Sequence, residues 1–555
     1  MRALLSFLLS LAGAAACAES TLIFNLRGYT MDHGERIDFV ALEYEDGVVR
    51  RLHRDSATLA ESSADARIDA AGATLLPGLI DAHGHVSYYG AALASVDLNG
   101  SASEAEAAQR VAAFLAGGGD GGEGWIRGRG WNQVLWPGKA FPTADALDAV
   151  TGDRPAALGR VDGHAVWVNS AALAAAGIDG DTPDPDGGQI IRGTDGQPSG
   201  VLVDNAMDLV YAIIGEPDVA QLEGQIMRGL EAVAATGMTA VHDAGISART
   251  LAAYRNLQAA GRLPIRAYAM LSVLDPANDE QLAAGPLRSD DGMLSVRSVK
   301  VIADGALGSR GAALHADYSD QPGHMGLLLL SDDELARHMR RSAAAGFQVN
   351  VHAIGDLANT RVLDEFEALN TDPALRALRH RVEHAQILRP VDIERFEALD
   401  VIASIQPTHA TSDKNMAGDR LGEARLRGAY AWDTLLESGA RLAGGSDFPV
   451  EPPNPLYGLH AAVTRTDRDG NPLGGWRPQE KLTREEALSL FTEWAAYAGH
   501  EEQTIGRLLP GYAADFVLLE EDYFTQPEQE IWSNTVLATV VAGRVVYAGE
   551  GSPLR

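Results

Sequence analysis

Apolar residues alternate with polar ones over short runs at both ends of the chain, a pattern that predicts β-strands. Such runs are TLIFNLRGYT near the N-terminus, and AADFVLLEEDYF and NTVLATVVAGRVVYAGEG near the C-terminus. The last run contains a hairpin turn at Ala542-Gly543. We therefore expect residues 19–75 and 501–555 to pair into one small β-sandwich beside a central domain.

The centre of the chain shows a different rhythm, in which apolar β-branched runs alternate with amphipathic segments such as 333–347. Repeated βα units of this kind predict a parallel sheet, and a (β/α)8 barrel accounts for residues 76–500. A long insertion after the first strand, residues 95–235, separates it from the second. The eight expected strands are 74–83, 238–245, 264–271, 298–305, 347–356, 380–386, 401–407 and 441–449.

Two histidines, His83 and His85, follow the apolar run that forms the first expected barrel strand. Side chains two residues apart on a strand point to the same face, so these imidazoles form half of a metal site. A histidine pair by itself is more often structural. Here further candidate ligands recur at the ends of the other strands, where a barrel carries its functional groups: Lys300, His352, His384 and Asp447. Nitrogen and oxygen donors suit zinc or a similar divalent ion.

These residues lie in phrases that resemble the amidohydrolase superfamily of metal-dependent hydrolases. The phrases PGLIDAHGH, GMTAVHDAG, VKVIADGALGSRGAAL, VHAIGD, VEHAQ, GGSDFPVEPPNP and LTREEALSLFT spread this resemblance over nearly the whole chain. RVDGHAVWVNSAAL, DGALGSR and PGYAADFVLLEED resemble more narrowly the branch that includes N-substituted formamide deformylase. Gly311 and Tyr512 depart from the usual pattern, and neither is a proposed ligand.

The resemblance implies one or two divalent metal ions, with zinc as the expected metal, that activate water for attack. It also implies that Lys300 is carboxylated, which would make it an anionic ligand between two metals; the alternative is an ordinary lysine paired with Asp304. Asp447 is expected to be both ligand and proton shuttle, with His384 as a further catalytic residue. The alternative for Asp447 is a helix N-cap.

Several other polar and aromatic residues are candidate substrate contacts. His164, Asp162 and Trp167 lie in the insertion, which we expect to overhang the barrel mouth. Arg310 would hold an anionic substrate group or pair with a surface carboxylate. Structural use is the alternative for each member of the full set, which comprises Asp162, His164, Trp167, Asp304, Arg310 and His409.

Composition restricts the partners and the location. The formal charge of −31 argues against nucleic acid and anionic lipid as partners. Residues 1–18 resemble a secretory signal with cleavage after Ala18, which predicts a periplasmic or secreted protein. Lipidation of Cys17 and an uncleaved anchor are less favoured alternatives. Cys17 is the only cysteine, so a mature chain would have no thiolate ligand.

We therefore expect an exported hydrolase that cleaves an amide-type carbon–nitrogen bond, other than a peptide bond, in a small molecule. Opening of a cyclic amide or lactone is an alternative reaction. A non-catalytic periplasmic binding protein on the same fold is the alternative from another class. The pattern predicts no membrane span in the mature chain, and a homo-oligomer is compatible with it.

Overall fold

Both ends of the chain contribute to one β-sheet, as the alternating runs predict. The computed structural model describes residues 20–554 except 120–123, 161–164, 186–187 and 309, so the expected signal segment lies outside the described residues. The sheet order is β23-β22-β21-β5-β1-β2-β3, with β4 beside β1. Strand β5 pairs antiparallel with β21, which joins the two ends directly. The strands are β1 (Ser20–Asp32), β2 (Glu35–Glu45), β3 (Val48–His53), β4 (Ala66–Asp69), β5 (Thr74–Pro77), β21 (Phe516–Leu519), β22 (Val536–Val541) and β23 (Arg544–Ala548).

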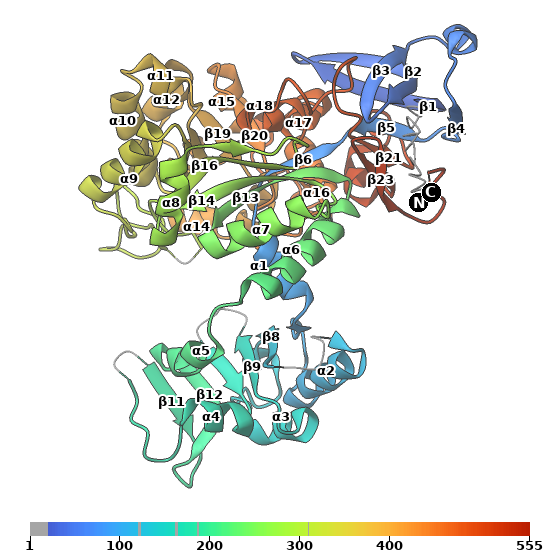
Figure 1. The fold of residues 1–555 in the computed structure, drawn as a ribbon. Coiled ribbons are helices and arrows are strands. Elements are labelled where there is room, and N and C mark those ends of the chain that lie inside the picture. The colour runs from blue at the N-terminus through green and yellow to red at the C-terminus, as the bar shows by residue number, and fades with distance from the viewer. Residues whose placement is uncertain (1–19, 120–123, 161–164, 186–187, 309, 555) are drawn as a thin grey trace, which may run out of the picture.

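The central domain is a nearly closed barrel of eight parallel strands in the order β20-β19-β18-β17-β16-β14-β13-β6 (Figure 1). Each pairing along this path is parallel. The strands are β6 (Leu79–Gly84), β13 (Met238–Ile246), β14 (Arg266–Ser272), β16 (Leu294–Ile302), β17 (Gln348–Ala353), β18 (Arg381–His384), β19 (Ile402–Ile405) and β20 (Leu442–Gly444). The predicted fold class is confirmed.

Helices cover the outside of the barrel between successive strands (Figure 1). They include α6 (Val219–Ala234), α7 (Ala248–Ala259), α9 (Asp332–Ala344), α10 (Asp356–Leu369), α12 (Pro390–Leu399), α15 (Trp432–Glu437), α16 (Pro455–Thr464), α17 (Arg484–Leu490) and α18 (Glu493–Ala498). Shorter helices, α8 (Asp279–Ala284), α11 (Pro373–Arg376), α13 (Pro407–Asp413) and α14 (Ala417–Leu421), lie in the connections. Among the described residues, no helix combines the length and apolar character needed to cross a membrane.

The first expected strand, 74–83, is two strands in the structure. β5 belongs to the sheet of the chain ends, and β6 is the first barrel strand. The chain changes sheets at Gly78, where a Cβ would lie only 2.2 Å from Oγ1 of Thr239. Glycine is needed at this junction because the backbone passes so close to the neighbouring strand.

The barrel closes through residues beyond its shortest strand. The expected eighth strand, 441–449, is regular only over Leu442–Gly444. After it, the Asp447 N–H donates to the His83 carbonyl at 2.7 Å, and the His85 N–H donates to the Phe448 carbonyl at 2.8 Å. The closure therefore occurs at the level of the predicted metal ligands.

The insertion is a separate lobe with its own six-stranded sheet (Figure 1). Its strands are β7 (Val96–Asp97), β8 (Ile126–Trp131), β9 (Ala156–Arg160), β10 (Ala165–Val168), β11 (Gly188–Arg192) and β12 (Pro198–Asp204), and its helices are α2 (Glu104–Ala116), α3 (Ala144–Thr151), α4 (Ser170–Ala176) and α5 (Asp208–Ile214). α1 (Val86–Leu93) leads into the lobe and packs against α6, which returns from it. Because α6 packs on the barrel side, the lobe itself comprises the elements from β7 to α5, which lie within the predicted insertion 95–235.

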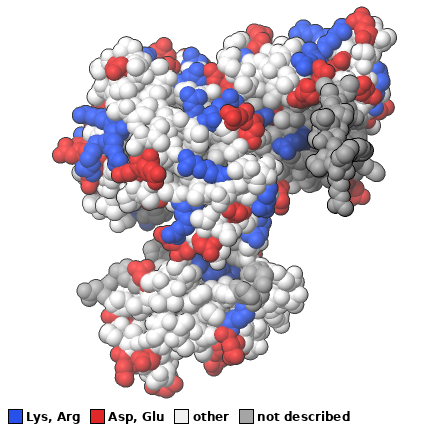
Figure 2. Space-filling view, viewed as in Figure 1, with Lys and Arg blue, Asp and Glu red and all other residues white. Residues whose placement is uncertain are grey.

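Charged side chains of both signs are distributed over the surface. On the face shown in Figure 2, basic side chains are interspersed with acidic ones and separated by large uncharged areas. Many of the cations pair with neighbouring carboxylates, as Arg310 does with Asp320 at 2.9 Å. The excess of negative charge is therefore not balanced by an extended basic region on this face.

Candidate metal centre

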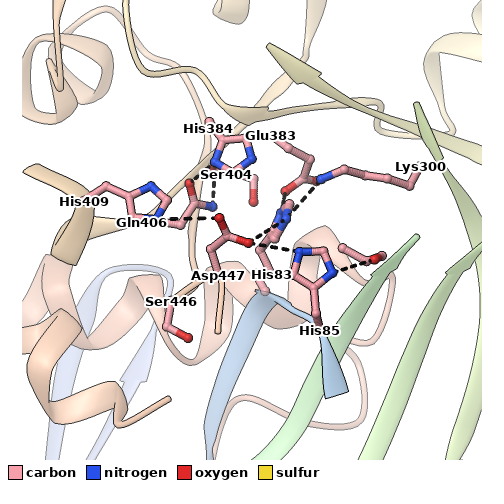
Figure 3. A network of polar contacts seen from close by, with 12 residues as sticks. His83, His85, Lys300, Glu383, His384, Ser404, Gln406, His409, Ser446 and Asp447 are labelled. Atoms are coloured by element: carbon pink, nitrogen blue, oxygen red, sulfur yellow. Dashed lines mark hydrogen bonds and ion pairs between the residues drawn. The ribbon is translucent and has the colours of Figure 1, made fainter. Parts of the chain in front are cut away.

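Five of the six residues predicted to bind metal lie together at one end of the barrel in Figure 3, namely His83, His85, Lys300, His384 and Asp447. The sixth, His352, joins them through a ring contact with His384. Nε2 of His85 lies 3.0 Å from Oδ1 of Asp447, and Nε2 of His83 lies 3.6 Å from the same oxygen. Nζ of Lys300 lies 3.0 Å from Nε2 of His83. The ring of His384 lies 4.9 Å from that of His83, between centroids, and 4.5 Å from that of His352. Residues far apart in the sequence thus form one cluster.

Left-handed backbone at two positions turns side chains into this cluster. His384 ends β18 with a φ of 77°, and Asp447 follows β20 with a φ of 63°. Non-glycine residues rarely adopt this conformation, and its occurrence at a functional site is a recognised form of local strain. Surrounding hydrogen bonds keep these residues in place. One of them joins Nδ1 of His384 to Oε1 of Gln406 at 2.7 Å.

Asp447 is the member shared by two groups of possible ligands. His83, His85 and Asp447 form one group, and His384, His409 and Asp447 form another, with the ligand atoms of each group within 4.8 Å of one another. Nε2 of His409 lies 3.6 Å from Oδ2 of Asp447. The ring of His409 also stacks on that of His384, with centroids 5.8 Å apart. His409, predicted as a substrate contact, therefore lies within reach of a metal as well.

Burial keeps the imidazoles in the neutral form that binds metal. Desolvation, reinforced by Lys300, lowers the pKa of His83 to about 4 and that of His352 to about 3. Burial alone would raise the pKa of Asp447, but its hydrogen bond with His85 and the surrounding imidazoles hold this pKa well below its usual value. Near pH 7, His83, His352 and His384 are thus neutral nitrogen donors beside the Asp447 carboxylate.

The donor set fits a divalent ion. The ring atoms Nε2 of His352 and Nε2 of His409 are buried and have no hydrogen-bond partner among the described residues. Orphaned buried acceptors of this kind are expected where an ion supplies the missing partner. Imidazole nitrogens and carboxylate oxygens are ligands of zinc and similar metals.

Lys300 does not pair with Asp304, the alternative considered for an ordinary lysine. Its Nζ faces His83. Asp304 instead accepts hydrogen bonds from the backbone N–H groups of Ala313, Ile354 and Gly355, at 2.8 to 2.9 Å. Asp304 thus links the loop after β16 to the loop after β17, and its Oδ1 also lies 3.5 Å from Nε2 of His352.

Two other predicted substrate contacts, Trp167 and Arg310, already bind other groups of the protein. Trp167 is completely buried in the inserted lobe, where its Nε1 donates to the Thr143 carbonyl at 2.8 Å. Arg310 forms a two-pronged ion pair with Asp320, at 3.1 and 2.9 Å. Neither is therefore a free group at the metal cluster. Asp162 and His164 lie outside the described residues.

Sequence reasoning missed the groups that hold the ligands in place. Glu383 hydrogen-bonds Nδ1 of His83, and it is completely buried. Asp81 accepts the His83 N–H at 2.9 Å and the Ser446 hydroxyl at 2.7 Å, which ties the first strand to the segment before Asp447. Asp81 and Glu383 are acidic residues at buried strand positions, and that placement was the available signal.

Comparison with known proteins gives a family match and several relatives. The model of the amidohydrolase family matches residues 66–547. The chain is 33% identical to YtcJ of Bacillus subtilis over 538 residues, which cover 94% of this chain and 98% of that protein. It is 27% identical to the N-substituted formamide deformylase of Arthrobacter pascens over 505 residues, 87% of this chain and 90% of that enzyme. A crystal structure of an uncharacterized metal-dependent hydrolase from Pyrococcus horikoshii aligns with a TM-score of 0.78 at 27% identity, covering 92% of this chain and 99% of that one.

Proposed function

Because this chain belongs to the amidohydrolase family, we propose that it hydrolyses a non-peptide carbon–nitrogen bond of the amide type in a small molecule. Family membership supports a metal-dependent hydrolase. The printed name of the Arthrobacter pascens relative, a deformylase of N-substituted formamides, supports the choice of an amide. The single observation that carries the proposal is the Asp447 carboxylate, which two groups of imidazoles share.

The residues proposed to hold metal are His83, His85, Lys300, His352, His384 and Asp447. One or two divalent ions, with zinc as the proposed metal, would lower the pKa of water and polarise the substrate carbonyl. The lowered pKa values of His83, His352 and His384 favour this role, because a protonated imidazole cannot act as a ligand.

Asp447 is proposed to move the proton. Its carboxylate would accept a proton from the attacking water at one oxygen and return it to the departing nitrogen. Nε2 of His85 lies 3.0 Å from Oδ1 of this carboxylate, and Nε2 of His409 lies 3.6 Å from Oδ2. His384 stacks beside His409 and would help to position the substrate carbonyl and the carboxylate.

We also propose that Lys300 is carboxylated. Carbon dioxide reacts with a neutral amine: the nitrogen–carbon bond forms, one proton leaves, and the product is an anionic carbamate. Burial lowers the pKa of Lys300 to about 8, which raises the fraction of neutral amine near pH 7. A carbamate beside His83 would provide the acceptor oxygens that an ammonium lacks.

Export through residues 1–18 remains part of the proposal. It is supported by the short apolar run, the single early arginine and the small residues before Glu19.

The test is a comparison of Asp447→Asn with the native chain on a panel of linear and cyclic amides, after loading with Zn²⁺. We expect kcat/KM to fall by about 10²- to 10⁴-fold, because Asn cannot carry the proton. The control is Asp469→Asn, an exposed carboxylate on another loop, which should retain full activity. A folded Asp447→Asn variant with native activity would refute the assigned role. A Zn²⁺-loaded native chain that cleaves none of the amides would refute the proposed function.

A further inference from the structure

Large apolar side chains are exposed directly beside the metal cluster. Tyr88 and Val450 are each 69% exposed, and Ile302 is 36% exposed. Each lies a few residues after a proposed metal ligand, on the same stretch of chain: Tyr88 after His85, Ile302 after Lys300, and Val450 after Asp447. The polar cluster thus has an apolar border contributed by three separate segments, which we call the apolar rim (Tyr88, Ile302 and Val450).

The direction of Ile302 follows from strand geometry. It is the last residue of β16, two residues beyond Lys300, and side chains two apart on a strand point to the same face. Lys300 points into the barrel and is almost fully buried, whereas Ile302 is partly open to solvent. Ile302 pairs in register with His352 on β17. It therefore lies one layer above Lys300, at the mouth of the barrel.

The other two members are placed by their contacts. The ring of Tyr88 meets the ring of His85 edge-on, with centroids 6.1 Å apart. The Val450 N–H donates to the Asp447 carbonyl at 2.9 Å, so a tight turn holds Val450 next to the proposed proton shuttle. Neither side chain is buried by the inserted lobe, since both remain more than two-thirds exposed.

The segment after the β16 loop extends this apolar surface. The Leu329 N–H donates to the Ala303 carbonyl at 2.8 Å, and Leu328 forms an antiparallel bridge with Asp304. The segment therefore runs beside the end of β16, next to Ile302. Met325, Leu327 and Leu329 are 50%, 62% and 55% exposed. Exposed apolar side chains grouped on neighbouring stretches of chain are the kind of surface that binds a ligand.

Two cations that could bind an anionic substrate group, Arg310 and Lys414, already pair with carboxylates of the protein. Arg310, the cation considered for an anionic substrate group, is bound by Asp320. Lys414, which follows the helix that carries His409, pairs with Asp467 at 2.8 Å. Among the described residues, these two cations therefore already have carboxylate partners, whereas Nε2 of His352 and Nε2 of His409 have no hydrogen-bond partner.

We infer that the substrate carries an apolar group of alkyl or aryl size, which the apolar rim binds while the amide lies at the metal cluster. This inference rests on the proposed amide hydrolysis and adds the chemical class of the substrate. An apolar group leaves water when it covers Tyr88, Ile302 and Val450, and the free energy gained grows with the buried area. A ligand site of this kind combines apolar walls with a few polar groups that orient the reacting bond.

The experiment measures kcat/KM for two homologous series with the Zn²⁺-loaded full chain. In one series the N-substituent lengthens from methyl to hexyl on a formamide, and in the other the acyl chain lengthens on an N-methyl amide. We expect kcat/KM to rise about two- to fourfold per methylene in at least one series. The series that responds identifies which side of the amide faces the rim.

Variants connect the response to the named residues. Val450→Thr keeps the shape of the side chain and adds a hydroxyl, and Ile302→Thr also removes the terminal methyl, so each should flatten the rise of kcat/KM with chain length. Using both keeps the test valid if one fails to fold. The control is Val545→Thr, a partly exposed valine in β23 of the sheet of the chain ends, which should leave the rise unchanged.

The outcomes separate this inference from the proposed function. If amides are cleaved but kcat/KM is flat in both series, or if both threonine variants keep the full rise, the apolar site is overturned and the proposed function stands. If no member of either series is cleaved, both are overturned. A rise that Val450→Thr or Ile302→Thr diminishes, and Val545→Thr does not, supports the inference.

Discussion

A buried ion pair between Glu383 and Arg381 contacts His83, the first of the proposed metal ligands. Glu383 hydrogen-bonds Nδ1 of His83, and Nε of Arg381 lies 2.8 Å from Oε1 of Glu383. Arg381 also donates to the Ala82 carbonyl at 2.7 Å. Burial opposes the ionised form of Glu383, but Arg381 and His83 hold its pKa well below the usual value. A carboxylate on Nδ1 fixes the tautomer that presents Nε2 to a metal.

Glu383→Gln should therefore weaken the binding of Zn²⁺ by about 10- to 100-fold, because a neutral amide orients and polarises His83 less strongly. The measurement is the Kd for Zn²⁺ from competition with a chromophoric chelator. Glu502→Gln is the matched control, since Glu502 pairs with Arg379 at 2.8 Å outside the metal cluster. A folded Glu383→Gln chain with the native Kd would show that Glu383 does not position His83.

At the scale of elements, the placement of α1 depends on close packing against α6. A Cβ on Gly229 of α6 would lie 2.6 Å from the carbonyl oxygen of Val86, the first residue of α1. Because His85 immediately precedes α1, this contact also constrains the chain that carries a proposed ligand. Gly224, on the same helix, has no atom within 4 Å of a Cβ position.

Gly229→Ala should destabilise the protein by about 1–3 kcal/mol, because the added methyl overlaps backbone that cannot rotate away. Gly224→Ala should stabilise it by about 0.5–1 kcal/mol, since alanine loses less backbone entropy in a helix. Urea unfolding of the two variants and the native chain measures both free energies. Equal effects of the two substitutions would contradict the close α1–α6 contact.

The whole molecule combines a barrel that carries the candidate metal centre with a lobe that has hydrophobic cores of its own. Buried clusters centred on Trp131 and on Val166 lie entirely within the inserted lobe. Two short stretches of chain, at 94–95 and 215–218, join the lobe to α1 and α6 (Figure 1). All of the proposed ligands belong to the barrel. Metal binding should thus stabilise the barrel and leave the lobe nearly unchanged.

Chelation of the metal should lower the thermal unfolding midpoint of the barrel, because a ligand present at 10³ times its Kd contributes about 4 kcal/mol of stability. Hydrogen exchange monitored by mass spectrometry reports the two parts separately. Peptides from β16 to β20 should exchange faster after chelation, and peptides from β8 to β10 should not. Equal acceleration in both parts would mean that lobe and barrel unfold together.

Hydrophobic patterning was enough to place the barrel strands to within a few residues, because strand alternation and helix periodicity are local properties. The pattern did not predict the direction of side chains on residues whose backbone departs from regular strand geometry. Strict alternation places Glu383 and His384 on opposite faces of β18. The left-handed φ of His384 turns its side chain back into the mouth, so that both residues reach His83. No local pattern predicts that dihedral angle.

The sequence by itself determined the order of the elements, the pairing of the chain ends and the set of nitrogen and oxygen donors at the strand ends. Only the tertiary structure decided which of the candidate substrate contacts bind other groups of the protein instead. Arg310 forms an ion pair with Asp320, and Trp167 is buried in the inserted lobe. Asp304 accepts hydrogen bonds from three backbone N–H groups. The physical reason is that residue type sets what a side chain can bind, whereas the neighbours brought together by folding set what it does bind.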